Sequence, residues 1–319
     1  MRHLFLLAAV CWVLAPMQGL GTTISYPNFS STTGLNLIYT PATPIRSMTV
    51  PGYGGQTVLR LTPAAAGQGG AAWSTNSIAF ATGADTFSTY FQFQITNPGG
   101  YAPADGIVFV VQTTSNSVGG NGGSIGYGGV TPSVGIEFDT FLNPGWDPNN
   151  NHVGIDIDGG ANVPGTLTSL VTASPGGVTN CLSPVGVPNC MANGDVWSVW
   201  IDYDGTNLSV ALADNSTVRP ANIITFPINV PCVLAGGTVG GTGCPTTPST
   251  AFVGFTAGTG AGYETQDVLD WTYTVPYNPI NPNPPSVPAL SPWAMAVLGI
   301  LMAATAAMVL RKRRHAGIQ

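Results

Sequence analysis

Short runs that alternate apolar and polar residues dominate the chain between Ile24 and Val275. Residues Thr86–Ile95 and Trp197–Tyr203 are the clearest examples. Successive side chains of a strand point to opposite faces of a sheet, so each run predicts a strand with one buried face. The second run is followed by Asp204-Gly205 and then by Leu208–Leu212, which predicts a hairpin. Without repeats or a long amphipathic helix, the pattern predicts an all-β fold of two stacked sheets.

The turn of that hairpin contains a second pattern, Asp202-x-Asp204-Gly205, which resembles the first positions of a calcium-binding loop. The later ligand positions and the closing glutamate of such a loop are absent from the sequence. We therefore interpret this segment as a turn.

The distribution of charged residues along the chain limits which kinds of molecule the protein can bind. Only 7% of the residues are charged, whereas 44% are hydrophobic, and 42 Gly and 27 Pro supply turns between short strands. From Thr22 to Leu290 three arginines stand against all 14 acidic residues, a net charge of −11. Binding of nucleic acid requires a basic patch, so we expect no nucleic-acid partner. Bound divalent cations would neutralise part of the excess negative charge.

The N-terminus predicts export. Residues 1–21 have the form of a signal peptide, because a short polar start precedes the apolar Leu4–Ala15. Cleavage after Gly21 fits the preference for small residues at this position. A lipoprotein signal would use Cys11 instead, but Val10 is a poor residue before a lipidated cysteine.

The C-terminus predicts a membrane anchor. A linker rich in Pro and Asn, residues 276–288, leads to a terminal segment, residues 289–319. Within this segment Trp293–Leu310 contains eighteen uncharged, mostly apolar residues, enough for a transmembrane helix. The cationic Arg311–Arg314 should stay in the cytoplasm, which leaves residues 22–288 outside. We expect the ectodomain at the cell surface, or secreted if the anchor is removed.

The residues before the predicted helix carry a motif. Val287-Pro288-Ala289-Leu290-Ser291-Pro292-Trp293 resembles the Ile-Pro-Thr-Leu-Ser-x-Trp (IPTL-type) sorting signal of bacterial C-termini. This resemblance implies a Gram-negative bacterium and allows proteolytic removal of the tail. Val287 and Ala289 depart from the motif, so an ordinary single-pass anchor is the alternative.

Cysteine usage agrees with export. Removal of the signal peptide leaves four cysteines, an even number that indicates disulfides in an exported chain. Three connectivities can be drawn, and we favour the local pairs Cys181–Cys190 and Cys232–Cys244 because each closes a loop rich in Gly and Pro. A cysteine metal site is the alternative, although no CxxC spacing is present.

Potential metal ligands concentrate in one short segment. Its donors are Glu137, Asp139, Phe141, Asn143, Asp147 and His152. The first four are spaced by two, so on an extended strand they project from one face. Two carboxylates side by side on that face repel each other unless a cation lies between them. A loop containing Pro144, Gly145 and Pro148 would return the last two donors to the strand end.

The donor types suggest which metals the segment would bind. Carboxylates, an amide oxygen and a backbone carbonyl suit calcium, which takes 6–8 oxygen ligands. One imidazole added to carboxylates suits an octahedral transition ion such as manganese. His152 is the only histidine between the signal peptide and the tail, and Glu137 is one of two glutamates. The alternative is that these are ordinary polar residues at a strand end and turn.

Residues 134–158 resemble the metal-binding signature of the legume (L-type) lectins, with Glu-Phe-Asp-Thr-Phe, Asn, Trp-Asp-Pro, His and Gly-Ile-Asp in order. The similarity extends from Ile24 to Tyr273. It implies a jelly-roll sandwich of the concanavalin A type. It also implies a manganese (Mn2+) site formed by Glu137, Asp139, Asp147 and His152. A calcium (Ca2+) site would be formed by Asp139, the carbonyl of Phe141, Asn143 and Asp147.

The same resemblance implies a sugar site beside the calcium. Asp105, preceded by a cis peptide bond that calcium holds through water, would accept hydrogen bonds from sugar hydroxyls. The other contacts would come from the Gly123 N–H, the Asn143 amide, the Phe141 ring and the backbone at Ala261 and Gly262. The fourth loop, Ala261–Gln266, is as short as in mannose/glucose binders, so we expect a ligand of that type.

Two other functions compete with carbohydrate binding. A sandwich glycosidase needs a second carboxylate about 5–5.5 Å from the first if it retains configuration. Phe141 and Leu142 occupy the positions where it would follow Asp139, and the other glutamate, Glu264, is far away in sequence. A structural surface protein would not need six donors. We therefore expect a metal-dependent lectin and not an enzyme.

Overall fold

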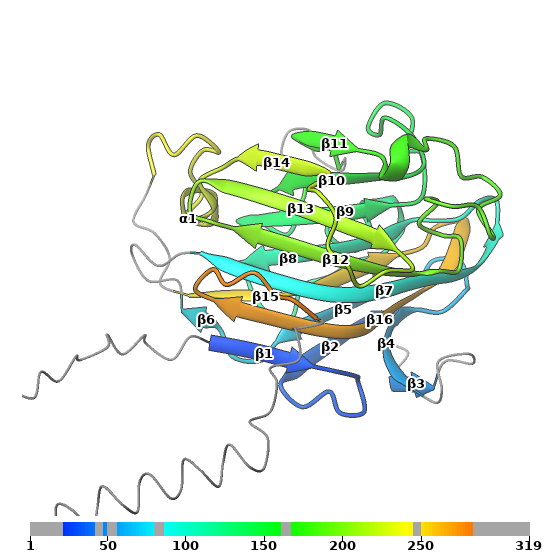
Figure 1. Ribbon diagram of the computed structural model, residues 1–319, viewed down its shortest axis with the longest axis horizontal. Coiled ribbons are helices and arrows are strands. Elements are labelled where there is room, and N and C mark those ends of the chain that lie inside the picture. The colour runs from blue at the N-terminus through cyan, green and yellow to red at the C-terminus, as the bar shows by residue number, and fades with distance from the viewer. Residues whose placement is uncertain are drawn as a thin grey trace, which may run out of the picture. The chain divides into compact units, whose positions relative to one another are not determined.

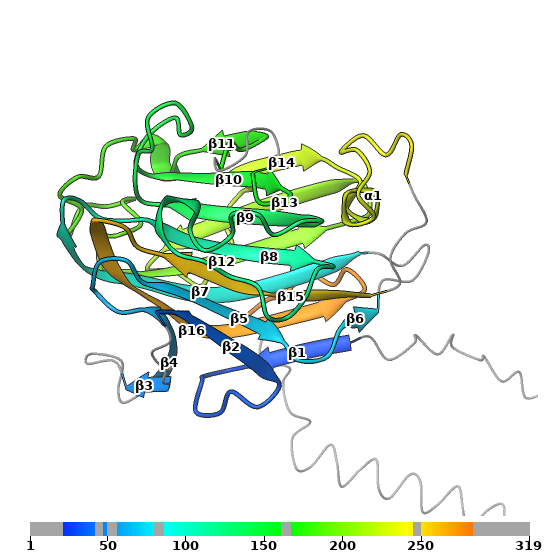
Figure 2. The same cartoon turned by 180° about the vertical axis from the view of Figure 1, so that it is seen from behind.

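The computed structural model describes residues 22–41, 47–49, 56–79, 86–160, 167–244 and 250–282. They form a sandwich of two antiparallel sheets, each of eight strands (Figures 1 and 2). The prediction of an all-β sandwich is therefore confirmed. The predicted signal peptide and the transmembrane helix at 293–310 lie outside the described residues, and within these residues no helix is long and apolar enough to cross a membrane.

Sheet A holds the longest strands. Its order is β14 (Ile224–Pro227), β13 (Asn207–Asp214), β12 (Val196–Tyr203), β7 (Phe87–Gly100), β16 (Gly262–Val275), β4 (Thr57–Thr62) and β3 (Ser47–Thr49), with β1 (Thr22–Tyr26) paired to β16. The predicted strands at 86–95, 197–203 and 208–212 are β7, β12 and β13, and β7 extends five residues further than predicted, to Gly100.

Sheet B carries the candidate ligands. Its order is β11 (Val171–Ala173), β10 (His152–Ile157), β9 (Ser133–Asp139), β8 (Gly106–Gln112), β15 (Thr250–Gly258), β5 (Gly69–Ser74) and β2 (Leu35–Thr40), with β6 (Ile78–Ala79) paired to β15. The described helices are short: η1 (Gly122–Ser124), η2 (Pro175–Gly177) and α1 (Val230–Leu234).

The core between the sheets is rich in aromatic rings. Phe255 of sheet B makes edge contacts with Phe91 and Trp271 of sheet A, with ring centroids 5.0 Å apart in both pairs. Alternation along β9 sends Ile136 and Phe138 into this core. Glu137 and Asp139 therefore point to the outer face of sheet B.

Sheet B is covered on its outer face as well. Trp73, Val110 and Tyr127 belong to a second buried apolar cluster there, and Trp73 Nε1 donates a hydrogen bond to the Val118 carbonyl at 2.8 Å. The segment that follows β8 supplies Tyr127 to this cover. Acidic side chains on this face are consequently shielded from water instead of exposed.

The β12–β13 hairpin has the predicted turn. Asp204 Oδ1 accepts hydrogen bonds from the backbone nitrogens of Thr206 and Asn207, at 2.8 and 2.7 Å. Asp202 forms an ion pair with Arg219. These contacts agree with our interpretation of the segment as a turn.

The chain after β16 packs against the outer face of sheet A. The backbone nitrogens of Tyr277 and Asn278 donate to Thr86 Oγ1 and Ser88 Oγ, at 2.9 and 3.0 Å. Trp200 Nε1 donates to the Ile280 carbonyl at 3.1 Å. The predicted linker thus begins with a segment that is held on the sheet, residues 277–280.

Candidate functional site

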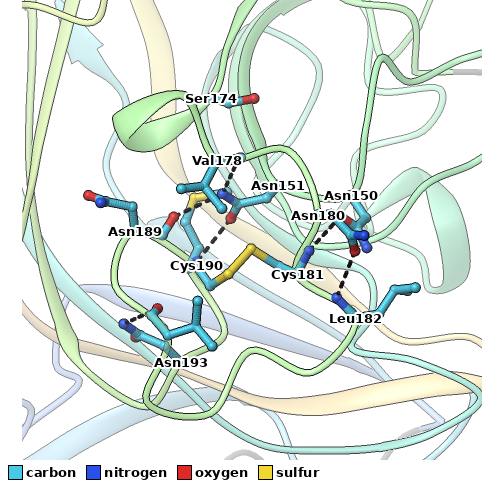
Figure 3. Close-up of a disulfide and its surroundings, with 12 residues drawn as sticks. Asn150, Asn151, Ser174, Val178, Asn180, Cys181, Leu182, Asn189, Cys190 and Asn193 are labelled. Atoms are coloured by element: carbon cyan, nitrogen blue, oxygen red, sulfur yellow. Dashed lines mark hydrogen bonds between the residues drawn. A yellow bond between two sulfur atoms is a disulfide. The ribbon is translucent and has the colours of Figure 1, made fainter.

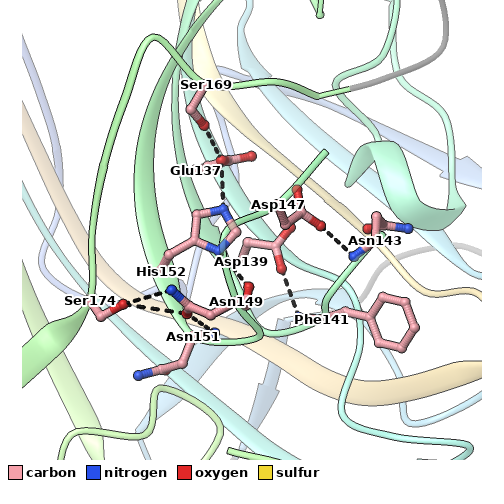
Figure 4. Close-up of polar contacts among 10 residues, drawn as sticks. All are labelled: Glu137, Asp139, Phe141, Asn143, Asp147, Asn149, Asn151, His152, Ser169 and Ser174. Carbon is pink, nitrogen blue, oxygen red and sulfur yellow. Dashed lines mark hydrogen bonds and ion pairs between the residues drawn. The ribbon is translucent and has the colours of Figure 1, made fainter. Parts of the chain in front are cut away.

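Two adjacent strands bring the first candidate ligands together. In the β9–β10 pair His152 lies opposite Asp139, and Gly154 lies opposite Glu137. The side chains of Glu137, Asp139 and His152 therefore share one face. His152 Nε2 lies 3.0 Å from Glu137 Oε1, and its Nδ1 contacts the Asn149 carbonyl at 3.0 Å (Figure 4). A proton on Nδ1 satisfies that carbonyl and leaves Nε2 available to a metal.

The strand ends earlier than we predicted. β9 stops at Asp139, so the prediction that Phe141 and Asn143 continue its face is wrong. Asp139 Oδ1 accepts the Phe141 N–H at 2.7 Å, which turns the chain away from the sheet. The backbone nitrogens of Trp146 and Asp147 then donate to the Asn143 carbonyl, at 3.0 and 3.2 Å.

This turn still returns the donors to the strand end. Asp147 Oδ2 accepts the Asn143 N–H at 2.5 Å, which Figure 4 shows as a dashed line. Ligand atoms of Glu137, Asp139 and His152 lie within 4.8 Å of one another. Three donors distant by up to fifteen positions in sequence are thus brought together at one end of β9.

Several oxygens of this group have no protein partner. Among the described residues Glu137 Oε2, Asp139 Oδ2 and Asn143 Oδ1 are buried and accept no hydrogen bond. A buried polar atom left unpaired costs free energy, and natural proteins rarely leave one. A cation bound by these oxygens would satisfy all three, so the residues present fit a metal ion.

Burial also shifts the ionisation of this cluster. It raises the pKa of Glu137 to about 7 and that of Asp147 to about 6, and it raises the pKa of Asp139 well above its usual range. It lowers the pKa of His152. These shifts belong to the protein without a metal, where nothing compensates the buried negative charges. A divalent cation would reverse the shifts of the carboxyl groups, since it favours their ionised form, and it would lower the pKa of His152 further, since it favours the neutral imidazole.

Sequence reasoning missed two members of the cluster. Asp156, two residues after Gly154, is fully buried, and both of its oxygens lack a hydrogen-bond partner within the described part of the chain. Ser169 donates a hydrogen bond to Glu137 Oε1. Gly154 is required here, because a Cβ would collide with both Ser169 Oγ and Glu137 Oε1. The Gly-Ile-Asp run was visible in the sequence, but only the strand register shows that its aspartate faces Glu137.

Asp105 lies beside the candidate ligands, directly before the neighbouring strand β8. The Ala104–Asp105 peptide is cis, as the resemblance implied. The Asp105 carbonyl accepts the Thr140 N–H at 3.0 Å, which ties this residue to the end of β9. Its Oδ2 is buried without a partner among the described residues, and burial raises the pKa of Asp105 to about 7.

Some residues of the predicted sugar site lie close to one another. A Cβ on Gly123 would lie 2.7 Å from Asn143 Nδ2, so only glycine lets the two approach. A Cβ on Gly260 would lie 3.6 Å from Asp105 Oδ2. The Phe141 ring is 6.1 Å from that of Tyr101.

The fourth loop is shorter than we predicted. β15 ends at Gly258 and β16 begins at Gly262, so most of the predicted loop Ala261–Gln266 is strand. The remaining turn, residues 259–261, is closed by a hydrogen bond of 3.0 Å from the Gly260 nitrogen to the Gly262 carbonyl.

Glu264 is nearer to the site than its position in sequence suggested. It is fully buried on β16, and its Oε1 accepts hydrogen bonds from Thr140 Oγ1 at 2.6 Å and Gln266 Nε2 at 3.1 Å. Burial raises the pKa of Glu264 to about 7. Because it lies beneath the surface, it is not available to a substrate, and it supports the residues above it.

The disulfides are the two local pairs that we favoured. Cys181–Cys190 and Cys232–Cys244 have sulfur separations of 1.95 and 2.00 Å. The first loop is fastened to the residues before His152: Asn150 Oδ1 accepts the Cys181 N–H at 2.9 Å (Figure 3). Asn151, which is fully buried, donates to the carbonyls of Val178 and Asn189 at 2.9 Å each.

Comparison with known proteins matches two family descriptions. The legume lectin domain matches residues 22–287, and the IPTL-CTERM motif matches residues 285–315. The lectin alpha chain of Lablab purpureus is 31% identical over 197 residues, which cover 59% of this chain and 58% of that protein. Favin of Vicia faba is 31% identical over 198 residues, which cover 59% of this chain and 69% of favin. The match therefore spans less than two thirds of the Lablab lectin.

Solved structures resemble the sandwich over most of its length. The winged bean acidic lectin, solved with methyl-α-D-galactose, has 25% identity and a TM-score of 0.58, and the match covers 81% of this chain and 99% of that lectin. The winged bean basic lectin, solved with Tn-antigen, has 24% identity, the same TM-score and the same coverage. These proteins are lectins, which fits our expectation of a protein that is not an enzyme.

Proposed function

Because the chain belongs to the legume lectin domain family, we propose that it is a lectin whose sugar site is the surface around Asp105, Gly123, Asn143 and residues 259–262. The observation that carries the proposal is the buried, unpaired Asp105 Oδ2 beside this open turn. A carboxylate that has no protein donor is available to accept hydrogen bonds from hydroxyl groups of a ligand.

We propose further that binding depends on calcium and a transition ion such as manganese. Glu137 and His152 would hold the transition ion, Asn143 and the Phe141 carbonyl would hold the calcium, and Asp139 and Asp147 would be ligands of both. When bound, the ions would neutralise the buried carboxylates and order the loop that carries Asn143. The unpaired oxygens of Glu137, Asp139 and Asn143 support this assignment.

The chain's own residues would divide the recognition of sugar between polar and apolar contacts. Asp105 would accept hydrogen bonds from hydroxyl groups of the sugar. Asn143 Nδ2 and the Gly123 N–H would donate hydrogen bonds to its hydroxyl oxygens. The Phe141 ring covers the apolar face of the pyranose. The backbone of Ala261 and Gly262 adds a further donor and limits how far the ring can shift.

Replacing Asp105 by Ala should lower sugar affinity by roughly ten- to a hundredfold, because a hydrogen bond to a charged acceptor contributes about 1.5–3 kcal/mol. The metal content should not change, since Asp105 is not a proposed ligand. Calorimetric titration with elemental analysis of the same samples tests both statements. Unchanged sugar binding would show that the site is misplaced.

We propose a mannose- or glucose-type ligand because the turn at residues 259–261 is short. A short turn leaves the Asp105 carboxylate open to hydroxyls that a longer loop would obstruct. Titration of the purified protein with methyl α-mannoside and with methyl α-galactoside distinguishes the two types. Tighter binding of the galactoside would refute this specificity without refuting sugar binding.

The C-terminal motif supports a proposal about location. We propose that residues 289–319 hold the protein in the inner membrane, at least until processing, with residues 22–288 outside. Protease added to intact spheroplasts should then degrade the ectodomain but spare cytoplasmic marker proteins. An ectodomain that is protected until the cells are lysed would contradict this topology.

A structural surface protein that retains the fold without binding sugar is the second candidate. A glycan array probed with the purified protein, with and without chelator, separates the two. Binding that chelator abolishes supports a metal-dependent lectin. No binding in either condition would favour the structural role.

A further inference from the structure

A cleft of about 610 Å³ adjoins the proposed sugar site. Its walls include Tyr101, Phe141, Leu142, Thr179, Asn180 and Leu182. Phe141 belongs both to this cleft and to the proposed sugar site. Ala102, which also lines the cleft, accepts the Tyr263 N–H at 3.2 Å and so lies against the start of β16. The cleft is therefore a continuation of the proposed site and not a separate surface.

The disulfide loop forms the far wall of the cleft. Thr179, Asn180 and Leu182 come from the segment around Cys181, which Asn150 and Asn151 fasten to the chain just before His152 (Figure 3). Asn150 also lines the cleft, and its exposed fraction is only 7%. The wall is thus held by a covalent bond and by buried hydrogen bonds, so a ligand would not have to order it.

The lining has the chemistry of a carbohydrate subsite. Tyr101 and Leu182 are 81% and 63% exposed, unusual for large apolar side chains, and exposed apolar groups beside a cleft often mark a binding surface. Thr179 and Asn180 add a hydroxyl and an amide. No charged side chain lines the cleft, so it offers nothing to neutralise an ionic ligand. Apolar surfaces combined with neutral hydrogen-bonding groups suit a pyranose ring, which has an apolar face and polar edges.

We propose that this cleft is a second sugar subsite and that the natural ligand is an oligosaccharide. The terminal residue would bind at Asp105, and the next residue would lie between Tyr101 and Leu182. This inference rests on the proposed lectin function. It adds that the Cys181–Cys190 loop selects ligands by length.

Comparison of oligosaccharides with their terminal monosaccharide tests the subsite. A glycan array of mannose-, glucose- and galactose-terminated chains identifies the best oligosaccharide, which is then titrated beside its methyl monosaccharide. The unmodified protein should bind the oligosaccharide at least about tenfold more tightly. Tyr101→Ala and Leu182→Ser should remove most of this advantage and leave affinity for the monosaccharide unchanged.

Matched variants control for changes in the loop. Val185 lies in the same disulfide loop and is 72% exposed, but it does not line the cleft, so Val185→Ser should retain the advantage. Equal affinity for the oligosaccharide and the monosaccharide in the unmodified protein would overturn the subsite alone. An equal loss in the Leu182 and Val185 variants would overturn it as well. A protein that binds no sugar in the presence of both metals would instead refute the lectin function, and the subsite with it.

Discussion

Replacing Asp139 by Asn should remove both metal ions from the protein and abolish sugar binding. Asp139 is fully buried between Glu137 and the returning loop, and we propose that it would be a ligand of both ions. Substitution of even an outer-shell partner of a metal ligand typically lowers metal affinity by about 10- to 100-fold. Loss of a carboxylate that binds both ions should lower metal affinity at least as much. Elemental analysis after dialysis against metal-free buffer at neutral pH measures the loss directly.

The control is a carboxylate of equal charge outside the site. Asp204→Asn removes a negative charge at the exposed β12–β13 turn and should leave metal content and sugar binding unchanged. Full metal content in the Asp139 variant would show that the ligands are misassigned. Sugar binding by unmodified protein from which all metal has been removed would refute metal dependence itself.

The metal-free protein should lose stability as the pH rises from 5 to 8. Burial raises the pKa values of Glu137, Glu264 and Asp105 to about 7 in the folded protein. Carboxyl groups of an unfolded chain have pKa values of about 4. The folded state then binds these protons more tightly than the unfolded state. The resulting stabilisation is fully present below the unfolded pKa and is lost as the pH rises through the folded pKa.

The size of this effect should be easy to measure. Each of these carboxyl groups should contribute on the order of 1–3 kcal/mol to the free energy of unfolding at pH 5. The midpoint of thermal unfolding of the metal-free protein should therefore be several degrees lower at pH 8 than at pH 5. The loaded protein should show the opposite trend over the same range, because protons compete with metal for the carboxylates. Thermal denaturation of dialysed and reloaded samples at several pH values tests both trends.

Glu264→Gln provides the matched variant for this experiment. Gln can still accept the Thr140 hydrogen bond that Glu264 accepts at 2.6 Å, but it does not titrate. The metal-free variant should therefore lose less stability between pH 5 and 8 than the unmodified protein. An unchanged slope would show that Glu264 does not take part, and a metal-free protein more stable at pH 8 would contradict the prediction as a whole.

Local patterns in the sequence predicted much of the fold. The alternation that predicted β7, β12 and β13 reflects a property of each strand by itself, and the same is true of the hairpin turn at Asp204. The resemblance supplied the ligand set, and the structure brings ligand atoms of Glu137, Asp139 and His152 within 4.8 Å of one another. The extended face through Phe141 and Asn143 was wrong because one hydrogen bond, from Phe141 to Asp139, ends the strand.

Contacts between distant segments were harder to predict. Glu264 lies on β16 of one sheet and contacts Thr140, which follows β9 of the other sheet. No periodicity along the sequence predicts a contact between the two sheets. Ser169 contacts Glu137 for a similar reason, across the β9–β10 pair. The attachment of the disulfide loop by Asn150 and Asn151 depends on a long irregular segment, whose conformation follows no repeating pattern.

The position of β16 has a mechanical consequence. This strand begins at Gly262, beside the proposed sugar site, and ends at Val275, where the chain continues toward the proposed anchor. A pull between a bound glycan and the membrane would run along this strand, roughly 45 Å at about 3.4 Å per residue. It is hydrogen-bonded to β7 on one side and to β4 and β1 on the other, so the load would shear many hydrogen bonds together instead of opening them in turn. The chain after β16 is held on sheet A by separate hydrogen bonds, including the one from Trp200 Nε1 to the Ile280 carbonyl. These bonds would break first, so the segment between β16 and the proposed anchor would extend before the strands of either sheet separate.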